Sequence, residues 1–350
     1  MSAAAVNRLS FLSLLTPLLA LPALPATRAA GAATGTAAGD KKLIPTEDIC
    51  VRDPFIYADP KSGTYILYAQ SENRRGSGYK GVEAYTSTDL KNWTPPRRVL
   101  DLGALGIANR ATWAPEMHAY KGAFYLFTTL TFAGGAAPAK SARVRHGRGT
   151  WIFKSSSPLG PFKPLKDGPH TPPKWMALDG TLHVERDGTP WFVFCHEWVQ
   201  VGDGTIEAVP LKRDLSDVAG EPVTLFRASV APRVRPNLRV TDGPFLYRSP
   251  KSGALLMIWS TFLTGSDYCV LVAKSESGTV LGPWRGHTPL YTKHGGHGML
   301  FRTFEGKPPA AGLAPGQLTL SLHQPNSPGG KERLRLFPIR DTGDGLELAS

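Results

Sequence analysis

The stretch Leu178-Asp179-Gly-Thr-Leu-His-Val184 decides the fold, because its pattern recurs along the chain. An acidic residue stands beside a small one, a short apolar run follows, and a second apolar run begins at Trp191, after the Asp187-Gly188 turn. An Asp-Gly turn between two apolar runs is typical of a β-hairpin. The same order of residues occurs in four further pairs of segments: 53–57 with 64–69, 115–118 with 123–127, 242–247 with 254–259, and 296–301 with 317–322.

The residues that open these hairpins are evenly spaced. Asp53, Glu116, Asp179 and Asp242 follow one another at intervals of 63 residues, and His297 comes 55 residues after Asp242. A repeat of roughly this length with about four short strands has the size of a propeller blade. We therefore predict an all-β, five-bladed β-propeller. Two stacked sandwiches are the alternative, but they would not explain an acidic residue that recurs at one point of each unit.

The N-terminus is not part of this repeat. Arg8 precedes an apolar run over residues 9–24, and small residues follow at 29–32, which is the layout of a secretory signal peptide. We predict a signal peptide at 1–32, a flexible leader at 33–42 and the catalytic propeller at 43–350. The mature protein is then secreted or extracytoplasmic, without a membrane span after processing. A retained membrane anchor is the alternative for the same segment.

Composition narrows the class of partner. The chain has 350 residues and a formal net charge of +12, with its basic residues scattered rather than gathered with aromatic residues on one segment. This pattern does not predict a nucleic-acid groove. The three cysteines are too few for a disulfide scaffold and lack metal-site spacing. We expect a monomer that does not bind nucleic acid.

The repeat places chemistry at one end of the domain. Residues that open the inner strands of successive blades ring one mouth of the central channel, so the four acids and His297 should meet there. Carboxyl groups forced together repel, which raises the pKa of some while others stay ionised, and acid–base catalysis needs that division. An aspartate at a strand entrance also caps turns, and this is the alternative for any single one of them.

Further side chains are expected near this mouth. A hairpin returns to the end where it began, so His196 and Glu197, which close the second run of the third repeat, should lie near Asp179. Trp113 and Trp175 precede marker acids in the sequence and are candidates for stacking on sugar rings. Core packing is the alternative for both tryptophans.

The chain resembles glycoside hydrolase family 43 over roughly residues 43–340. The resemblance rests on five strings in the correct order: Arg52-Asp-Pro-Phe55, Trp113-Ala-Pro-Glu116, Leu178-Asp-Gly180, Thr241-Asp-Gly-Pro-Phe245 and Gly295-Gly-His-Gly-Met299. It implies a five-bladed propeller that hydrolyses arabinofuranosides, xylosides and related galactosides with inversion.

The resemblance also implies roles for single residues. Asp53 matches the general base and Asp179 the residue that tunes the pKa of the acid. Asp242 stands where the family has a glutamate as general acid, so Glu197 is the second candidate for that role. No cofactor is required, but a calcium ion or water cluster is implied near His297. The expected sugar contacts are Asn109, Trp113, Glu116, His118, Trp175, His196 and Arg302.

Two other functions stay open at this point. One is a carbohydrate-binding propeller without activity, which the Glu-to-Asp change at residue 242 favours. The other is a related fructan-processing hydrolase that retains configuration. The sequence does not identify the sugar, endo or exo action, or the pairing of the cysteines.

Overall fold

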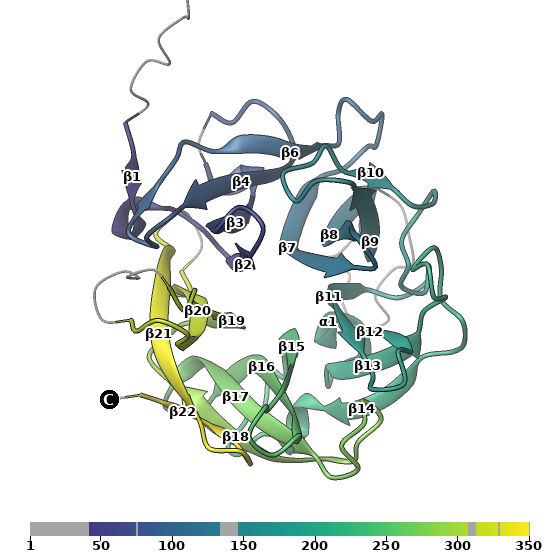
Figure 1. Ribbon diagram of the computed structural model, residues 1–350. Helices are drawn as coiled ribbons and strands as arrows, with labels where there is room; N and C mark the ends of the chain where they lie inside the picture. The colour runs from purple at the N-terminus through teal and green to yellow at the C-terminus, as the bar shows by residue number, and fades with distance from the viewer. Residues whose placement is uncertain (1–41, 75, 134–145, 307–312, 328–329, 350) are drawn as a thin grey trace, which may run out of the picture. The chain divides into compact units, whose positions relative to one another are not determined.

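The computed structural model describes residues 42–74, 76–133, 146–306, 313–327 and 330–349. In these ranges five four-stranded antiparallel sheets stand around a common centre (Figure 1). The predicted all-β, five-bladed β-propeller is therefore confirmed. The predicted signal peptide at 1–32 and nearly all of the leader at 33–42 lie outside the described residues, and that division of the chain stays a prediction.

Each blade contains four strands in chain order, with the first strand innermost (Figure 1). Blade one contains β2 (Phe55–Asp59), β3 (Thr64–Gln70), β4 (Gly81–Ser87) and β6 (Arg97–Asp101). Blade two contains β7 (Ala111–Tyr120), β8 (Ala123–Ala133), β9 (His146–Ser155) and β10 (Lys163–Pro164). Blade three contains β11 (Ala177–Val184), β12 (Pro190–His196), β13 (Thr205–Pro210) and β14 (Val223–Arg227). Blade four contains β15 (Asp242–Arg248), β16 (Leu255–Leu263), β17 (Asp267–Ser275) and β18 (Trp284–Tyr291). Blade five contains β19 (Gly296–Arg302), β20 (Leu318–Gln324), β21 (Arg333–Asp341) and β22 (Leu346–Leu348).

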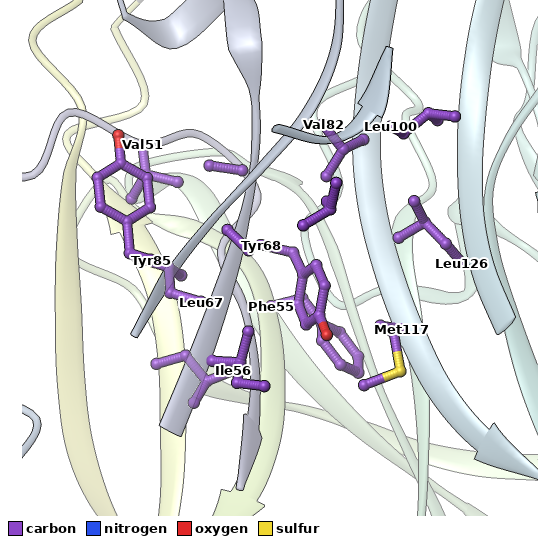
Figure 2. Close-up of a cluster of buried hydrophobic side chains, with 14 of the residues drawn as sticks. Val51, Phe55, Ile56, Leu67, Tyr68, Val82, Tyr85, Leu100, Met117 and Leu126 are labelled. Atoms are coloured by element: carbon purple, nitrogen blue, oxygen red, sulfur yellow. The ribbon is translucent and has the colours of Figure 1, made fainter. Parts of the chain in front are cut away.

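The continuous apolar runs of the sequence form middle strands whose two faces are both covered. In β12 all side chains from Phe192 to Cys195 are fully buried, and in β16 the same holds from Leu255 to Trp259. Between blades one and two, side chains of β2 and β3 pack against Met117 and Leu126 of the next blade (Figure 2). Burial of a large apolar side chain stabilises a fold by about 1.5–3 kcal/mol, so the blades hold one another through these contacts.

The N-terminal segment joins the first blade to the last. Val51 N–H donates to Glu332 O at 3.3 Å, and Leu334 N–H donates to Ile49 O at 3.4 Å. β1 (Ile44–Pro45) pairs with β5 (Asn92–Trp93) on the outside of blade one. No helix in the described ranges has the length and apolarity that a membrane crossing requires.

Candidate active site

Each blade has one left-handed residue near the start of its inner strand. In β7, β11, β15 and β19 it is the first of two residues that stand opposite one residue of the neighbouring strand, which is a β-bulge. In blade one it is Asp53, two residues before β2 begins. The left-handed residues, with φ between 43° and 57°, are Asp53, Ala114, Asp179, Gly243 and His297. A left-handed non-glycine residue is strained, and such strain gathers at functional sites. The side chains of Asp53, Asp179 and His297 meet from these positions.

The bulges correct the register expected from the sequence. The 63-residue spacing suggested that the four acids occupy one equivalent position, but only Asp53 and Asp179 do. Asp242 lies one residue before the bulge of its strand, and Glu116 lies two residues after Ala114. The four acids are nevertheless 63 residues apart, because differences in loop length between the blades compensate for these shifts in strand position. Asp242 is therefore nearer the mouth and Glu116 deeper.

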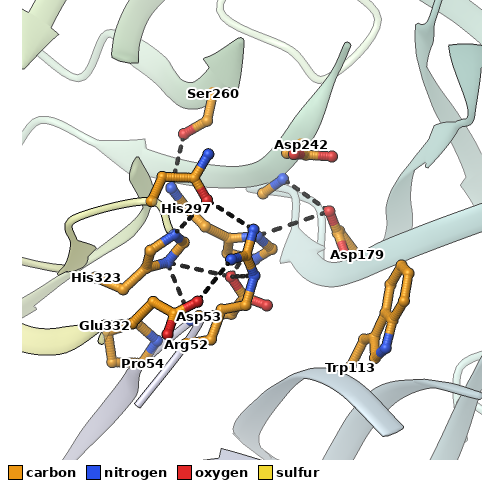
Figure 3. A network of polar contacts seen from close by, with 12 residues as sticks. Arg52, Asp53, Pro54, Trp113, Asp179, Asp242, Ser260, His297, His323 and Glu332 are labelled. Carbon is orange, nitrogen blue, oxygen red and sulfur yellow. Dashed lines mark hydrogen bonds and ion pairs between the residues drawn. The ribbon is translucent and has the colours of Figure 1, made fainter. Parts of the chain in front are cut away.

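A cluster of charged side chains surrounds His297 (Figure 3). Its Nδ1 lies 3.3 Å from Asp53 Oδ1 and 3.8 Å from Asp179 Oδ2. Gly243 N–H donates to Asp179 Oδ2 at 3.2 Å, and Tyr268 OH donates to Asp242 Oδ2 at 3.0 Å. The structure thus brings three of the predicted carboxyl groups and His297 together from four blades.

The environment separates the pKa values of these carboxyl groups. Burial alone would raise the pKa of Asp53, but the charges of His297 and Arg52 together hold it well below its usual range. Burial raises the pKa of Asp179 well above its usual range, against the opposing charge of His297. The pKa of Asp242 is also raised, chiefly by burial. Asp53 is the carboxylate that stays ionised.

Glu197 directly follows β12 and contacts Arg148 of blade two. Its Oε1 accepts a hydrogen bond from Arg148 Nη1, while its buried Oε2 has no partner among the described residues. The Arg148 guanidinium lies 3.8 Å from the centre of the Trp113 ring. Burial raises the pKa of Glu197 to about 7, although the charge of Arg148 opposes the rise. Glu197 therefore carries a proton over much of the acidic and neutral range.

These groups share one pocket of about 710 Å³. Asp53, Asp242 and Glu197 line it, as do Trp113 and Trp198. Asp179 and His297 are not among the lining residues; they lie behind Asp53 and Asp242 in the buried cluster. The pocket therefore exposes an ionised carboxylate and a protonated carboxyl group to the same ligand, with aromatic rings beside them.

Several predicted sugar contacts lie elsewhere. Glu116 is buried, 3.2 Å from His118, and His118 and Arg302 line a different pocket. Asn109 donates to Thr112 and is not among the lining residues. Trp175 stacks on His196 at 4.1 Å, the core-packing alternative for this residue. These six residues do not line the pocket because bulge and strand position, which the repeat spacing does not show, decide which side chains reach it. Among the seven predicted sugar contacts, Trp113 alone lines this pocket.

Sequence reasoning missed other members of the site. Arg52 donates to Asn326 Oδ1 at 2.7 Å and pairs with Glu332 at 3.1 Å, and all three line the pocket. Tyr268 also lines it, and His323 lies behind Asp53. Arg52 stands in the string that contains Asp53, which was an available signal. The others come from middle strands and loops that the repeat did not mark.

The residues at His297 do not by themselves make a calcium site. Calcium takes six to eight oxygen ligands. Among the described residues no group of three or more His, Cys, Asp or Glu side chains has an arrangement that could hold a metal ion. The nearby carboxylates already contact the His297 imidazole. The calcium ion or water cluster expected near His297 stays a prediction, and the steps below are derived from side chains alone.

Comparison with known proteins points to one family. The family model described as Glycosyl hydrolases family 43 matches residues 44–312. The solved structure of an endo-arabinase from Bacteroides thetaiotaomicron is 36% identical, with 86% of this chain and 98% of that chain covered and a TM-score of 0.69. An alpha-L-arabinofuranosidase from Lactobacillus brevis shares the fold at 15% identity, with 89% and 94% covered and a TM-score of 0.65.

A curated relative agrees with this result. It is an extracellular exo-alpha-(1->5)-L-arabinofuranosidase from Cellvibrio japonicus (strain Ueda107), 23% identical over 241 residues. The match covers 63% of this chain and 65% of the relative, so it spans slightly less than two thirds of that protein. The family model itself covers well over half of the chain, and the endo-arabinase is similar over nearly its whole length. The chain therefore belongs to glycoside hydrolase family 43.

Proposed function

We propose that this glycoside hydrolase cleaves arabinofuranosidic linkages with inversion of configuration. The observation that carries the proposal is one pocket lined by both Asp53, which stays ionised, and Glu197, which has a pKa of about 7. Inverting hydrolysis needs one carboxylate as general base and one carboxylic acid as general acid. The sugar is inferred from the 36% identical endo-arabinase and the curated arabinofuranosidase.

Asp53 is the proposed general base. Within the described part of the chain, the ion pairs of its carboxylate with Arg52 and His297 both use Oδ1, which also lies 3.3 Å from His323 Nδ1. Oδ2 is left to accept a proton from water. The water oxygen then forms a bond to the anomeric carbon on the face opposite the leaving group. Because the pKa of Asp53 is low, the base is ionised across the working range.

Glu197 is the proposed general acid. Since Oε1 is held by Arg148, the transferable proton belongs on Oε2, for which the described part of the chain offers no hydrogen-bond partner. That proton passes to the glycosidic oxygen as its bond to the anomeric carbon breaks, and Glu197 becomes a carboxylate beside Arg148. Asp242, in the family position, has Oδ2 occupied by Tyr268 and a shorter side chain. We assign Asp242 to substrate contact and Asp179 to tuning the charge around His297.

The protein is proposed to act outside the cytoplasm as a monomer. The N-terminal sequence has the layout of a signal peptide, and the curated relative is named as extracellular. The sequence and the pocket favour a carbohydrate partner rather than nucleic acid.

A panel of nitrophenyl glycosides tests the function. We expect release of nitrophenol from the α-L-arabinofuranoside to exceed release from the xyloside and the galactofuranoside. Faster xyloside cleavage would overturn the assigned sugar. Binding of arabino-oligosaccharides without any hydrolysis would favour a non-catalytic carbohydrate-binding protein instead.

A further inference from the structure

We propose that His323, held as the tautomer with hydrogen on Nε2, is the positioning residue for Asp53. The proposal rests on the proposed function in that Asp53 is taken as the general base. His323 lies on β20, is fully buried and is absent from the lining of the pocket. It therefore acts on the reaction through Asp53, without touching the substrate.

The first step of the argument is a hydrogen bond that recurs between neighbouring blades. At three of the left-handed positions, the backbone N–H donates to a side chain on the second strand of the preceding blade. The three pairs are Asp179 N with Thr129 Oγ1 at 3.0 Å, His297 N with Ser260 Oγ at 2.9 Å, and Asp53 N with His323 Nδ1 at 3.2 Å.

The three acceptors occupy one equivalent position. Each is the strand partner of the residue directly before a bulge: Thr129 faces Trp113, Ser260 faces Asp242, and His323 faces Gly296. The position thus holds an acceptor for the left-handed residue of the next blade. At blade five the acceptor is an imidazole, whose ring accepts at one nitrogen only when the hydrogen is on the other.

The neighbours of His323 decide where that hydrogen is. Arg52 Nη2 donates to Asn326 Oδ1 at 2.7 Å, and because a guanidinium only donates, this Asn326 atom is an oxygen acceptor. His323 Nε2 lies 3.2 Å from the same oxygen and must therefore donate to it. Nδ1 is left with a lone pair, which is what the Asp53 N–H requires.

This bond has two consequences for Asp53. It holds the backbone of Asp53 in its left-handed conformation, with φ of 53°. It also places the Nδ1 lone pair 3.3 Å from Asp53 Oδ1. This oxygen therefore receives no hydrogen bond from His323, and its contact is with His297 Nδ1. The direction of Oδ2, the oxygen proposed to accept the proton of water, then depends on His323.

Two substitutions separate the two nitrogens. In His323→Asn the side-chain oxygen can replace the Nδ1 acceptor, whereas in His323→Gln the longer amide can reach Asn326 but leaves Asp53 N–H without its acceptor. We expect His323→Asn to keep most of the kcat on an arabinofuranoside. We expect His323→Gln to lose up to about 100-fold in kcat, with KM nearly unchanged, because the base is misplaced. Equal losses in both variants, or a loss confined to KM, would overturn the proposal.

A matched control removes another buried histidine. His287 lies on the outer strand β18, buried, 3.4 Å from Trp284 O. His287→Gln should lower thermal stability without changing kcat. It therefore shows how much of the effect of His323→Gln comes from the loss of any buried imidazole. If His287→Gln lowers kcat as much as His323→Gln, the effect on Asp53 is not specific and the proposal fails.

The tautomer is measured independently of activity. Long-range ¹H–¹⁵N NMR of the wild-type protein should show hydrogen on Nε2 of His323 and none on Nδ1. Hydrogen on Nδ1, in either the other tautomer or the doubly protonated ring, would overturn the proposal. This measurement separates the two hypotheses, because a wild-type protein that hydrolyses no glycoside overturns the proposed function while the NMR result still decides the tautomer.

Discussion

The backbone of Gly243 lies against the imidazole of His297: a Cβ atom at residue 243 would come within 2.8 Å of Cδ2 of that ring. The same glycine has φ of 49° and donates its N–H to Asp179 Oδ2. A side chain here would push the ring that contacts both Asp53 and Asp179. The glycine therefore fixes the spacing of the buried cluster.

Gly243→Ala should lower kcat as well as stability. The displaced His297 ring would loosen its contacts with the two aspartates, so kcat should fall about 10- to 100-fold. Gly188→Ala is the control, since Gly188 has φ of 82° and open space around its Cβ position. Both variants should lose about 1–2 kcal/mol of stability from backbone strain. Chemical denaturation measures the stability of both variants, and steady-state kinetics measures their kcat. Equal kcat in the two variants would contradict the steric argument.

Asp53→Asn should abolish general base catalysis and leave the fold intact. The amide has the size of the carboxylate but cannot accept the proton of water. We expect kcat to fall by about 10²–10⁴-fold, measured on an arabino-oligosaccharide. Circular dichroism and the melting temperature serve as checks on folding. A folded variant with a near-normal rate would remove Asp53 from the mechanism.

Glu197→Gln and Asp242→Asn should differ in their dependence on the leaving group. A general acid matters most when the leaving oxygen is basic, so loss of the true acid slows natural arabinosides far more than activated aryl arabinosides. We expect this pattern for Glu197→Gln, and a similar loss on both substrates for Asp242→Asn. Rates on a series of aryl glycosides give the test. The reverse pattern would assign the acid to the family position.

Arg148→Met should move the alkaline limb of the pH profile. The acid must be protonated, so kcat/KM should fall above the pKa of Glu197, about 7. The charge of Arg148 lowers that pKa, and its removal should raise the pKa and shift the limb to higher pH. Arg186→Met is the control, because Arg186 is an exposed arginine that donates a hydrogen bond to Gly253 O at 3.0 Å and does not contact Glu197. A limb that stays in place or moves to lower pH would exclude Glu197 as the acid.

The sequence predicted the blades well, but it did not predict how far each inner-strand residue lies from the mouth of the channel. Turn pairs and continuous apolar runs mark strands locally, so the hairpin at 178–194 could be identified without any structure. A bulge leaves no comparable signal, because Asp179, Gly243 and Ala114 adopt the same backbone with different side chains. Equal spacing therefore placed Glu116 in the pocket, where it does not lie.

Residues brought together from distant blades were equally hidden. Arg148 and Glu197 meet only because β9 and β12 belong to neighbouring blades, and Asn326 reaches Arg52 only because the ring closes. Glu197 was within reach of prediction because a hairpin returns its second strand to the end where the first began. No local pattern marks His323, because it is one of several polar residues that alternate with leucines in β20.

The anomer released first tests the central claim most directly. ¹H NMR of the wild-type enzyme acting on an α-L-arabinofuranoside should show the β anomer before mutarotation, because Asp53 directs water to the face opposite the leaving group. Release of the α anomer would show retention of configuration, a covalent intermediate and a nucleophilic aspartate, and would contradict the account in which Asp53 is a base.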